Sequence, residues 1–521
     1  MKSSTQNFKF ILSTVLYISL VYSLLIFPQS KSKLSLSLKY VNPNAEIILG
    51  KDRLNLNFES LPSHETRLAF SSTNNFRTVN YLDTIDYNYI PWDADKHFWV
   101  AFSELVIIEF VPWALARWGR DWEDPEDNWA NVSSETWWRN ISYGWEYDGD
   151  AFLTNYFAHP YHGNMYYNTG RVNGYSFWES SVWAFAGSAF WEFFGETFRP
   201  SINDLINTSL NGINLGEMLF RLSAVVTDNT ETGTTRVFQE VGGALLNPVR
   251  GFSRLITGET SKIFQNPEES NPKGFSIKLD AGVRRLDKNG NVNATENVNE
   301  GVFSAEILYG NLFQGNIKKP FSWFGISAAI STRDPMLTNL QSFGNLYGWH
   351  LQKGKNTRHT VCATLNYNYF NNPGFTYGGT SVNSHLVSLF NLGAEFHFLT
   401  NLDVELIAMG AVPTDYYVDV EGRNYDFGPG IGINLGASLI KGKWNFARVY
   451  YSSRWTWTQS EPSDSRHHLH LVWFDVTYPI IDYLAVGLGF GAYWRNSYYE
   501  NEDDVFKRNR IIRLFLRAAL N

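Results

Sequence analysis

The sequence has one cysteine, few charged residues and no basic tract. Cys362 is the only thiol among 521 residues, so no disulfide framework is available. No cysteine stands directly after the N-terminal apolar run, which excludes a lipid-anchored lipoprotein. Charged residues make up 18%, below the quarter that is typical of soluble proteins. A formal net charge of −8 without a cluster of Lys and Arg excludes nucleic acid from the expected partners.

Familiar catalytic motifs are also missing. The chain has no Gly-x-Ser-x-Gly elbow, no Walker loop, no dinucleotide fingerprint and no His-Glu-x-x-His zinc motif. Ser188 and Ser201 could act as nucleophiles, but no neighbouring base in the sequence activates either one. The sequence therefore specifies no reaction, and we expect no cofactor.

Aromatic residues, in contrast, are abundant at 16%, with 19 Trp, 28 Tyr and 38 Phe. Trp and Tyr favour membrane–water interfaces. The first thirty residues place Lys2 and Lys9 around the start of an apolar run from Phe10 to Phe27. This pattern is typical of a secretory signal peptide cleaved near Ser30, with an uncleaved anchor helix as the alternative. An extended or flexible segment is expected over residues 31–91.

From Gly274 onward, apolar and polar residues alternate with a period of two. Clear examples are residues 275–284, 361–369, 484–494 and 512–520. Such alternation marks a strand with one apolar and one polar face. About twelve such segments, with polar loops between them and aromatic ends, predict an antiparallel transmembrane β-barrel over residues 274–521. A soluble β-sandwich or a lipocalin-like barrel is the alternative.

The preceding part, residues 92–258, has a helical period instead, and residues 259–273 form a linker. The expected helices cover about 95–118, 135–145, 150–171, 177–197, 202–225 and 236–255. The first is apolar nearly all round, which predicts burial among other helices or inside the barrel. Ser176 with Glu179 has the spacing of a capping box, and Ser201 with Asp204 is a near variant. The predicted fold class is α+β, a helical domain followed by a barrel.

Four motifs in the helical part carry a family resemblance. In order along the chain they read HPYHGNMYYNTGRVNGYSFWES, WEFFGE, PSINDLINTSLNGINLGEMLFRLS and NPVRGFSRLITG. Over about residues 92–258 the chain resembles the envelope proteins with domain of unknown function 3943. The resemblance implies a Gram-negative envelope protein, and it implies no activity and no catalytic residues.

Ionisable residues between His159 and Arg221 stand in an apolar setting. Burying an unpaired charge costs several kcal/mol, so these groups must be paired, hydrated or functional. The candidate catalytic residues are His159, His162, Glu192, Glu196 and Asp204. On a helix Glu192 and Glu196 would share a face, and two close carboxylates could act as acid and base. His159 and His162 could bind a metal with either glutamate, or serve as a general base.

Each of these residues also has a structural explanation. The histidines could form hydrogen bonds within a helix, and the glutamates could be neutralised by arginines from either part of the chain: Arg171, Arg199, Arg448, Arg454, Arg513 or Arg517. Glu217 and Arg221 have the spacing of an ion pair within one helix. Gly212 and Gly216 form a G-x-x-x-G spacing that permits close helix packing.

Two functions remain open from the sequence. The first is an integral outer-membrane barrel whose helical domain caps or fills the barrel, serving envelope structure or small-solute passage, because polar helix faces suit a polar lumen. The alternative is an envelope enzyme acting on lipid or another envelope substrate, with His162 and Glu192 as base and partner. The expected partners are outer-membrane lipids and the barrel-assembly machinery, with any small-molecule ligand unspecified. The expected location is the outer membrane, with the helices in the lumen or the periplasm.

Overall fold

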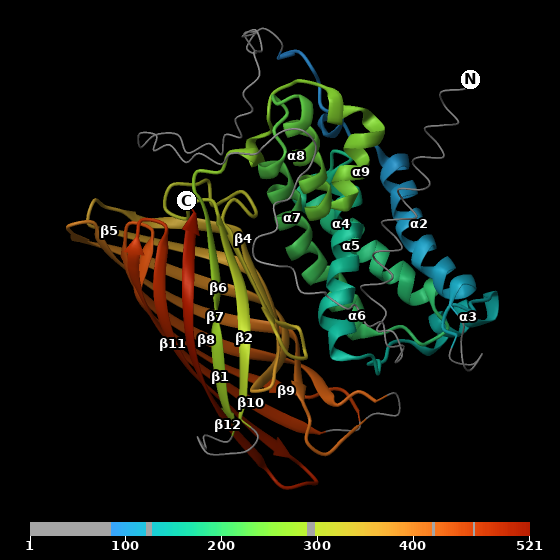
Figure 1. Cartoon of the computed structure of the whole chain (residues 1–521). Coiled ribbons are helices and arrows are strands. Elements are labelled where there is room, and N and C mark those ends of the chain that lie inside the picture. The colour runs from blue at the N-terminus through green and yellow to red at the C-terminus, as the bar shows by residue number, and fades with distance from the viewer. Residues whose placement is uncertain (1–84, 121–127, 289–296, 419–421, 462–463, 521) are drawn as a thin grey trace, which may run out of the picture.

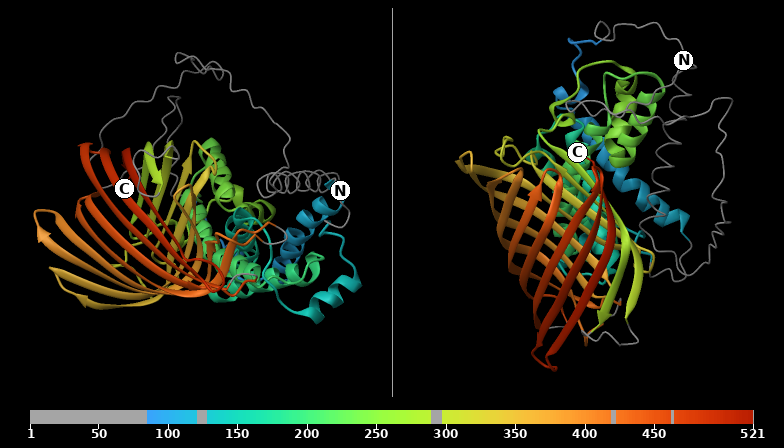
Figure 2. Two further views of the ribbon diagram at one scale, coloured as in Figure 1. Left: turned by 90° about the horizontal axis from the view of Figure 1, so that it is seen from below. Right: turned by 60° about the vertical axis from the view of Figure 1, so that its left-hand side comes forward.

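The computed structural model describes residues 85–120, 128–288, 297–418, 422–461 and 464–520 (Figure 1). The predicted signal peptide and residues 31–84 of the segment predicted to be extended lie outside these ranges. Two parts lie side by side in Figure 1 and in the left-hand view of Figure 2: a helical part, residues 92–270, and a barrel, residues 275–520.

The helices of the helical part lie close to the predicted ranges. Their bounds are α2 Phe98–Ala114, α3 Ser134–Tyr143, α4 His159–Arg171, α5 Phe177–Phe190, α6 Ile202–Ile206, α7 Gly212–Val226, α8 Gly233–Leu246 and α9 Pro248–Thr257. Ser176 and Glu179 form the predicted capping box at the start of α5. A single helix over 236–255 is wrong, because Asn247 leaves helical geometry and accepts the Arg250 N–H at 3.0 Å, which begins α9.

Wide π-helical turns lie within the longer helices or at their C-terminal ends. They are η3 Leu115–Gly119, η5 Thr154–Ala158, η6 Trp191–Gly195 and η7 Asn207–Asn211. The backbone is helical on both sides of η5 and η7, so each lies within a continuous helix. One extra residue in a turn rotates the residues after it by about 100°, and such turns are frequent at functional sites.

The second part is the predicted closed barrel of twelve antiparallel strands. The strands are β1 Phe275–Lys288, β2 Val298–Tyr309, β3 Phe324–Ser331, β4 Leu337–Lys353, β5 Thr357–Asn372, β6 Phe375–Gly393, β7 Phe396–Pro413, β8 Tyr425–Lys441, β9 Trp444–Trp457, β10 Ser465–Ile481, β11 Leu484–Tyr499 and β12 Val505–Leu520. Each strand pairs with the next in sequence, and β1 pairs with β12 from Ile277↔Leu520 onward. Closure leaves no unpaired strand edge, as a membrane requires.

Contacts across the lumen identify the inward faces of the strands. Arg448 Nη1 on β9 lies 3.5 Å from Glu306 Oε2 on β2, and the rings of Phe375 on β6 and Tyr493 on β11 lie 4.8 Å apart. These strands are not neighbours, so their side chains meet inside. Residues of the opposite phase point outward, and many are apolar and exposed: Leu279, Val283, Leu402, Val404, Leu406, Ile431, Ile433, Leu435, Leu488, Leu514 and Leu516. This pattern is that of a transmembrane barrel.

The lumen holds its own charge pairs. Arg454 Nε donates to Glu405 at 2.7 Å, and Arg517 Nε donates to Asp280 at 2.7 Å. The barrel arginines therefore neutralise barrel carboxylates, and the expectation that they neutralise Glu192 or Glu196 is wrong for these pairs. Toward the end of the barrel at which β6 begins, an apolar cluster fills the lumen: Leu286, Phe370, Phe375, Tyr377, Val412, Leu469, Leu471, Tyr493 and Ile511.

The helical part packs on the outer wall of the barrel. Asn214 Nδ2 on α7 donates to the carbonyl oxygen of Leu365 at 2.7 Å, and its Oδ1 accepts from Ser342 Oγ at 2.6 Å. Thr380 Oγ1 on β6 donates to Asn211 Oδ1 at 2.8 Å. Buried amides of the helices thus find their partners on strands β4, β5 and β6.

The phase of β6 shows that these contacts lie outside the lumen. Tyr377 points inward, with Arg454 5.0 Å above its ring, so the following residue, Gly378, faces outward. A Cβ at Gly378 would lie 2.5 Å from the ring of Tyr156, which places the ring of this helix residue directly on the wall. The expectation that the helices cap or fill the lumen is therefore wrong for the described contacts. The lumen is occupied by strand side chains and by the β2–β3 connection, whose Leu312 and Ile317 pack against the inward residues Cys362 and Val387.

Turns at the two ends of the barrel differ in length. At the end where β1 begins, residues 394–395, 442–443 and 482–483 join neighbouring strands directly. The opposite end, called here the loop end, carries the longer connections 414–424, 458–464 and 500–504. A long β2–β3 connection, residues 310–323, is the exception at the first end.

A buried charge network joins α4 to α7. Glu217 accepts from Arg171 Nε at 2.7 Å, from Arg221 Nε at 2.8 Å and from Tyr167 Oη at 2.7 Å. The predicted ion pair between Glu217 and Arg221 is confirmed. The predicted close helix packing is confirmed as well, because Gly212 on α7 lies directly against Gly163 on α4.

Candidate functional site

The ionisable residues gather where η5, η6 and the start of α6 meet, beside the loop end of the barrel. The chain segment before η5 lies against the start of α6: the Glu146 N–H donates to Pro200 O at 2.9 Å, and the Ile202 N–H donates to Glu146 O at 2.9 Å. Arg423, in the loop before β8, donates to the carbonyl oxygen of Asp148. This segment is thus held between the helices and the rim of the barrel.

His159 lies between two carboxylates. Its Nε2 is 3.6 Å from Asp150 Oδ2 and 3.7 Å from Asp204 Oδ1. Both separations exceed hydrogen-bond length. The Asp204 side chain is 4% exposed and that of Asp150 is 51% exposed, so the imidazole stands between a buried acid and a solvent-facing one. The structure therefore brings together two of the predicted residues, His159 and Asp204.

Asp148 is oriented by two amides. Its Oδ1 accepts from Asn155 Nδ2 on η5 at 2.9 Å and from Asn203 Nδ2 on α6 at 2.9 Å. Asn203 also accepts from Ser201 Oγ at 2.8 Å. Ser201 is therefore engaged in orienting the cluster, with no base placed to activate it among these contacts.

Three of these side chains could hold a divalent cation. One ligand atom each from Asp148, Asp150 and His159 lies within 4.8 Å of the others. Tetrahedral ligands about 2.1 Å from Zn²⁺ are separated by about 3.4 Å, close to the 3.6 Å between Nε2 and Oδ2. The expected ligand set of His159 and His162 with a glutamate is different from this group.

Glu192 is buried at the edge of the cluster, on η6. Its Oε2 accepts the Ser201 N–H at 2.7 Å. Arg171 pairs with Glu217, and Arg199 Nη1 lies 3.1 Å from Glu146, so the expected neutralisation of Glu192 by either arginine is wrong for these pairs. A backbone N–H, not a cation, satisfies this oxygen.

Two predicted residues lie apart from His159. The α5–η6 helix ends at Gly195, and Glu196 has extended backbone with φ −137° and ψ 163°, so it shares no helix face with Glu192. The expected pair of glutamates on one helix is therefore wrong. His162 lies one turn after His159, but its ring is 4.5 Å from that of Tyr166 and 5.5 Å from that of Trp191. Its setting is aromatic.

Sequence reasoning missed Asp148 and Asp150. Asp148 lies between two expected helices, and Asp150 is the first residue of the expected helix 150–171, whereas the backbone of both residues is irregular. The available signal was the spacing Asp-x-Asp, followed nine residues later by His159. Oxygen ligands at alternate positions with a nearby histidine are a common donor set for divalent metals.

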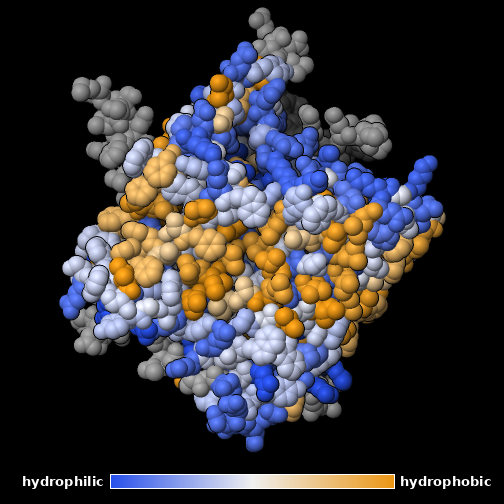
Figure 3. Space-filling view, turned by 180° about the vertical axis from the view of Figure 1, so that it is seen from behind, coloured by the Kyte–Doolittle hydropathy of each residue, from blue (hydrophilic) through white to orange (hydrophobic). Residues whose placement is uncertain are grey.

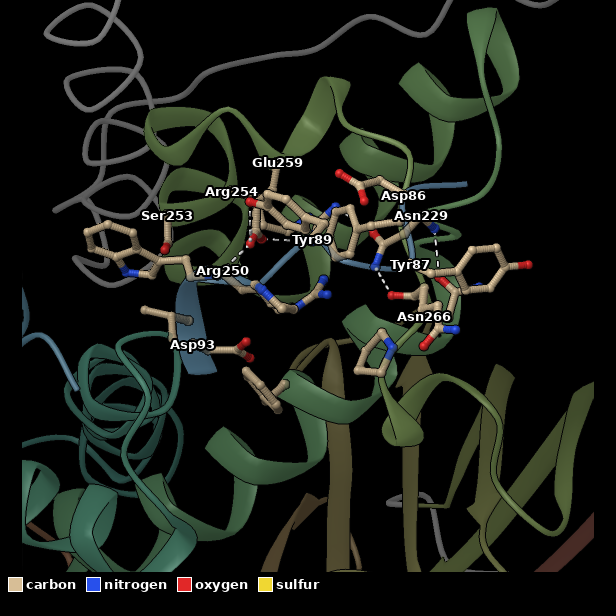
Figure 4. Close-up of a pocket in the computed structure, with 17 residues that line it drawn as sticks. Asp86, Tyr87, Tyr89, Asp93, Asn229, Arg250, Ser253, Arg254, Glu259 and Asn266 are labelled. Atoms are coloured by element: carbon tan, nitrogen blue, oxygen red, sulfur yellow. Dashed lines mark hydrogen bonds and ion pairs between the residues drawn. The ribbon is translucent and has the colours of Figure 1, made fainter. Parts of the chain in front are cut away.

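A separate pocket of about 210 Å³ lies at the other end of the helical part, beside α9 (Figure 4). Arg250 points into it and donates to Ser223 Oγ at 3.0 Å, while Arg254 Nη1 lies 3.3 Å from Glu259. Acidic side chains, including Asp93, line the same pocket. With both signs of charge present, the lining selects no ligand class.

The fold and the site together define a transmembrane β-barrel protein of the outer-membrane type, with a helical part that carries a histidine and carboxylate cluster. Residues 144–249 match the family model of the domain of unknown function DUF3943, which confirms the resemblance in the helical part. No curated protein sequence matches the chain.

Solved structures similar to this chain include a porin, an outer membrane channel and a transporter. The KdgM porin has 6% identity and a TM-score of 0.24, covering 47% of this chain and 99% of that one. An outer membrane channel from Pseudomonas putida F1 has 12% identity and a TM-score of 0.26, covering 49% and 100%. The Pseudomonas putida toluene transporter TodX has 8% identity and a TM-score of 0.20, covering 48% and 90%.

Proposed function

We propose that this outer-membrane barrel protein is an envelope enzyme whose acid–base site is built on His159, Asp150 and Asp204. The proposal is supported chiefly by where these groups meet, in helices packed on the outer wall. The passage hypothesis explained polar helix residues as the lining of a lumen, and helices outside the lumen need no such lining. A histidine held between a buried acid and a solvent-facing acid is a candidate for chemistry.

The three side chains have different roles in the proposed acid–base site. His159 is the group that takes a proton from the substrate and returns it, since imidazole titrates near neutral pH. Asp204 is buried and lies 3.7 Å from Nε2, the same ring nitrogen that faces Asp150, so it positions this nitrogen and does not hold the opposite one as the carboxylate of a Ser-His-Asp triad does. Asp150 stands on the solvent side, where the substrate enters.

The position of the site along the barrel axis favours a lipid substrate. Longer loops of bacterial outer-membrane barrels face the cell exterior, whereas the short turns face the periplasm. The cluster lies beside Arg423, in a connection at the loop end, which corresponds to the outer leaflet. The substrate class that this position supports is a lipid of the outer leaflet, such as lipopolysaccharide.

The test uses the full chain in vesicles of phosphatidylethanolamine and lipopolysaccharide, with lipid products followed by mass spectrometry. Loss of a general base lowers rate by about 10²- to 10⁴-fold, so the His159→Ala variant should lose nearly all turnover. His359→Ala, which removes a barrel imidazole bonded to Ser388 at 2.7 Å, is the matched control. Heat-modifiable migration on a gel checks that each variant is folded. If the wild-type chain converts no lipid beyond the His159→Ala background, the enzyme proposal is refuted.

Passage of a small solute through the barrel is the second candidate. It is favoured by the charged middle of the lumen, where Arg454 pairs with Glu405. Phe375 and Tyr493 stack across the lumen nearer the loop end, so passage requires these rings to move.

Conductance across a planar bilayer tests this candidate. Truncating both Phe375 and Tyr493 to alanine should raise the single-channel conductance several-fold over the wild-type chain if the lumen is the route. Equal conductance of the double variant and the wild-type chain would exclude this route. Leu516→Ala, on the outer wall, is the control for the effect of a substitution in the barrel.

A further inference from the structure

Helix α2 and η3 together form an exposed apolar surface. Residues Phe98–Gly119 form a helix of 22 residues that is long and apolar enough to cross a membrane. Its most apolar stretch of 18 residues has a mean hydropathy of 1.7, and only 28% of that stretch is buried within the protein. Its exposed side chains are Phe98, Trp99, Phe102, Val106, Ile107, Phe110 and Trp118. The expectation that this helix is buried among other helices or inside the barrel is therefore wrong for this face. A monomeric soluble protein rarely exposes so large a continuous apolar patch.

The two glutamates of α2 lie on the face opposite to these exposed apolar residues. Glu104 and Glu109 are both buried, and Glu104 accepts from Asn173 Nδ2 at 2.6 Å. In a helix of a soluble protein the apolar face turns inward and the charged face meets solvent. Here the arrangement is reversed, which is the pattern of a helix whose outer face meets lipid.

Helix α5 extends the same surface. Its exposed residues are Trp178, Val182, Phe185 and Phe190. Figure 3 shows an apolar band that runs from the helical part onto the barrel wall, with hydrophilic residues above and below it. Exposed apolar residues that point outward from the barrel wall include Val404 and Leu406 on β7 and Ile433 on β8. Those strands span the bilayer, so the helices lie at the same level.

We propose that the helical part is embedded in the outer membrane beside the barrel, with the outer faces of α2 and α5 in contact with lipid acyl chains. At 1.5 Å per residue, 22 residues span about 33 Å, against about 30 Å for the hydrocarbon core. Trp99 and Trp118 are 75% and 69% exposed. Nineteen residues separate them, about 28 Å, so they stand at the two levels where interfacial tryptophans gather.

Membrane burial also explains where the polar groups lie. Helices satisfy their own backbone hydrogen bonds, which is the condition for any segment in lipid. Polar side chains at this level, such as Asn214 and Asn211, bond to the barrel wall instead of facing outward. This inference stands apart from the proposed enzyme activity, because it depends only on the outer surface.

Site-directed spin labelling in phosphatidylcholine vesicles tests the proposal. Cys362 is 1% exposed, so the wild-type chain serves as the unlabelled background. Single cysteines at Phe102 and Ile107 carry nitroxides on the outer face of α2, with Val404 as the lipid-facing control and exposed Glu231 as the aqueous control.

Accessibility to oxygen and to a water-soluble nickel chelate distinguishes the outcomes. The F102C and I107C labels should match V404C, with high oxygen and low nickel accessibility. Labels that match E231C would place α2 in water and overturn the proposal. Low accessibility to both reagents, with dipolar broadening that disappears on dilution with unlabelled chain, would show that a second copy covers the face, which would also overturn it. Low accessibility that survives dilution would show that another protein covers the face, and the proposal would fail in that case too.

Discussion

Substituting Gly163 by alanine should separate two helices that the candidate site depends on. A Cβ at Gly163, on α4, would lie 1.7 Å from the carbonyl oxygen of Thr208 on η7. At Gly212, the residue facing it, a Cβ would lie 2.4 Å from the carbonyl carbon of Gly163. The atoms in the way are backbone atoms within a helix, so no side chain can rotate to make room.

The size of the effect follows from that geometry. Ordinary contact between a methyl group and an oxygen is about 3.4 Å, so the helices would have to part by more than about 1 Å along this line. Overpacking costs typically about 1–3 kcal/mol, and rigid backbone on both sides favours the upper part of that range. Alanine returns about 1 kcal/mol as a better helix former. We expect a net loss of about 2 kcal/mol in the free energy of unfolding of the helical part.

Far-ultraviolet circular dichroism at 222 nm during a urea titration in detergent micelles measures this loss, because the barrel adds little to the helical signal. Gly119→Ala is the control, since its Cβ would meet only Leu115 Cδ2 at 3.8 Å. If Gly163→Ala shifts the helical transition no more than Gly119→Ala does, the close approach of α4 to η7 is not as described.

Three further predictions concern other parts of the chain. Glu217→Ala leaves two buried arginines without their carboxylate and should lower the free energy of unfolding by about 3–5 kcal/mol in the same titration, and a loss under about 1 kcal/mol would contradict the network. Burial opposes ionisation of Asp415, but Arg495 and Lys507 outweigh it, and the pKa of this loop carboxyl lies below its ordinary value. Its stabilising effect is therefore complete above about pH 4 and is lost as the pH falls through the lowered pKa, so amide exchange in residues 414–418 should rise in acid, and Asp415→Asn should remove that rise. Calorimetric titration with Zn²⁺ should show binding that Asp150→Asn weakens at least tenfold, and equal affinities would exclude the cation site.

Much of the barrel was predictable because its pattern is repeated twelve times. Arg513 and Arg517 alternate with Leu514 and Leu516, and only a strand with one face in lipid and one in a polar lumen uses such a pattern. Local helix signals were equally direct, since a capping box such as Ser176 with Glu179 depends on residues three apart. Helix breaks at Asn247 and Gly195 were not predicted, because neighbouring residues keep a helical period through them.

The candidate site was predictable only in part. His159 and Asp204 were found because ionisable residues in an apolar stretch are conspicuous. Glu196 was wrongly paired with Glu192, because the helix ends at Gly195 after a π turn that the sequence does not announce. Asp148 and Asp150 lie in an irregular segment, whose position is set by hydrogen bonds to Pro200 and to the barrel rim.

By itself the sequence determined that the chain contains helices followed by a membrane barrel, because periodicity is a local property of the chain. Only the tertiary structure decided on which side of the barrel wall the helices lie. Alternation shows that a strand has two different faces, but the outward residues under the helices, such as Tyr367 and Ser342, are as polar as residues of a lumen. They are polar because Tyr156 and Asn214 bond to them, and a partner about 130 residues or more away in sequence leaves no periodic trace.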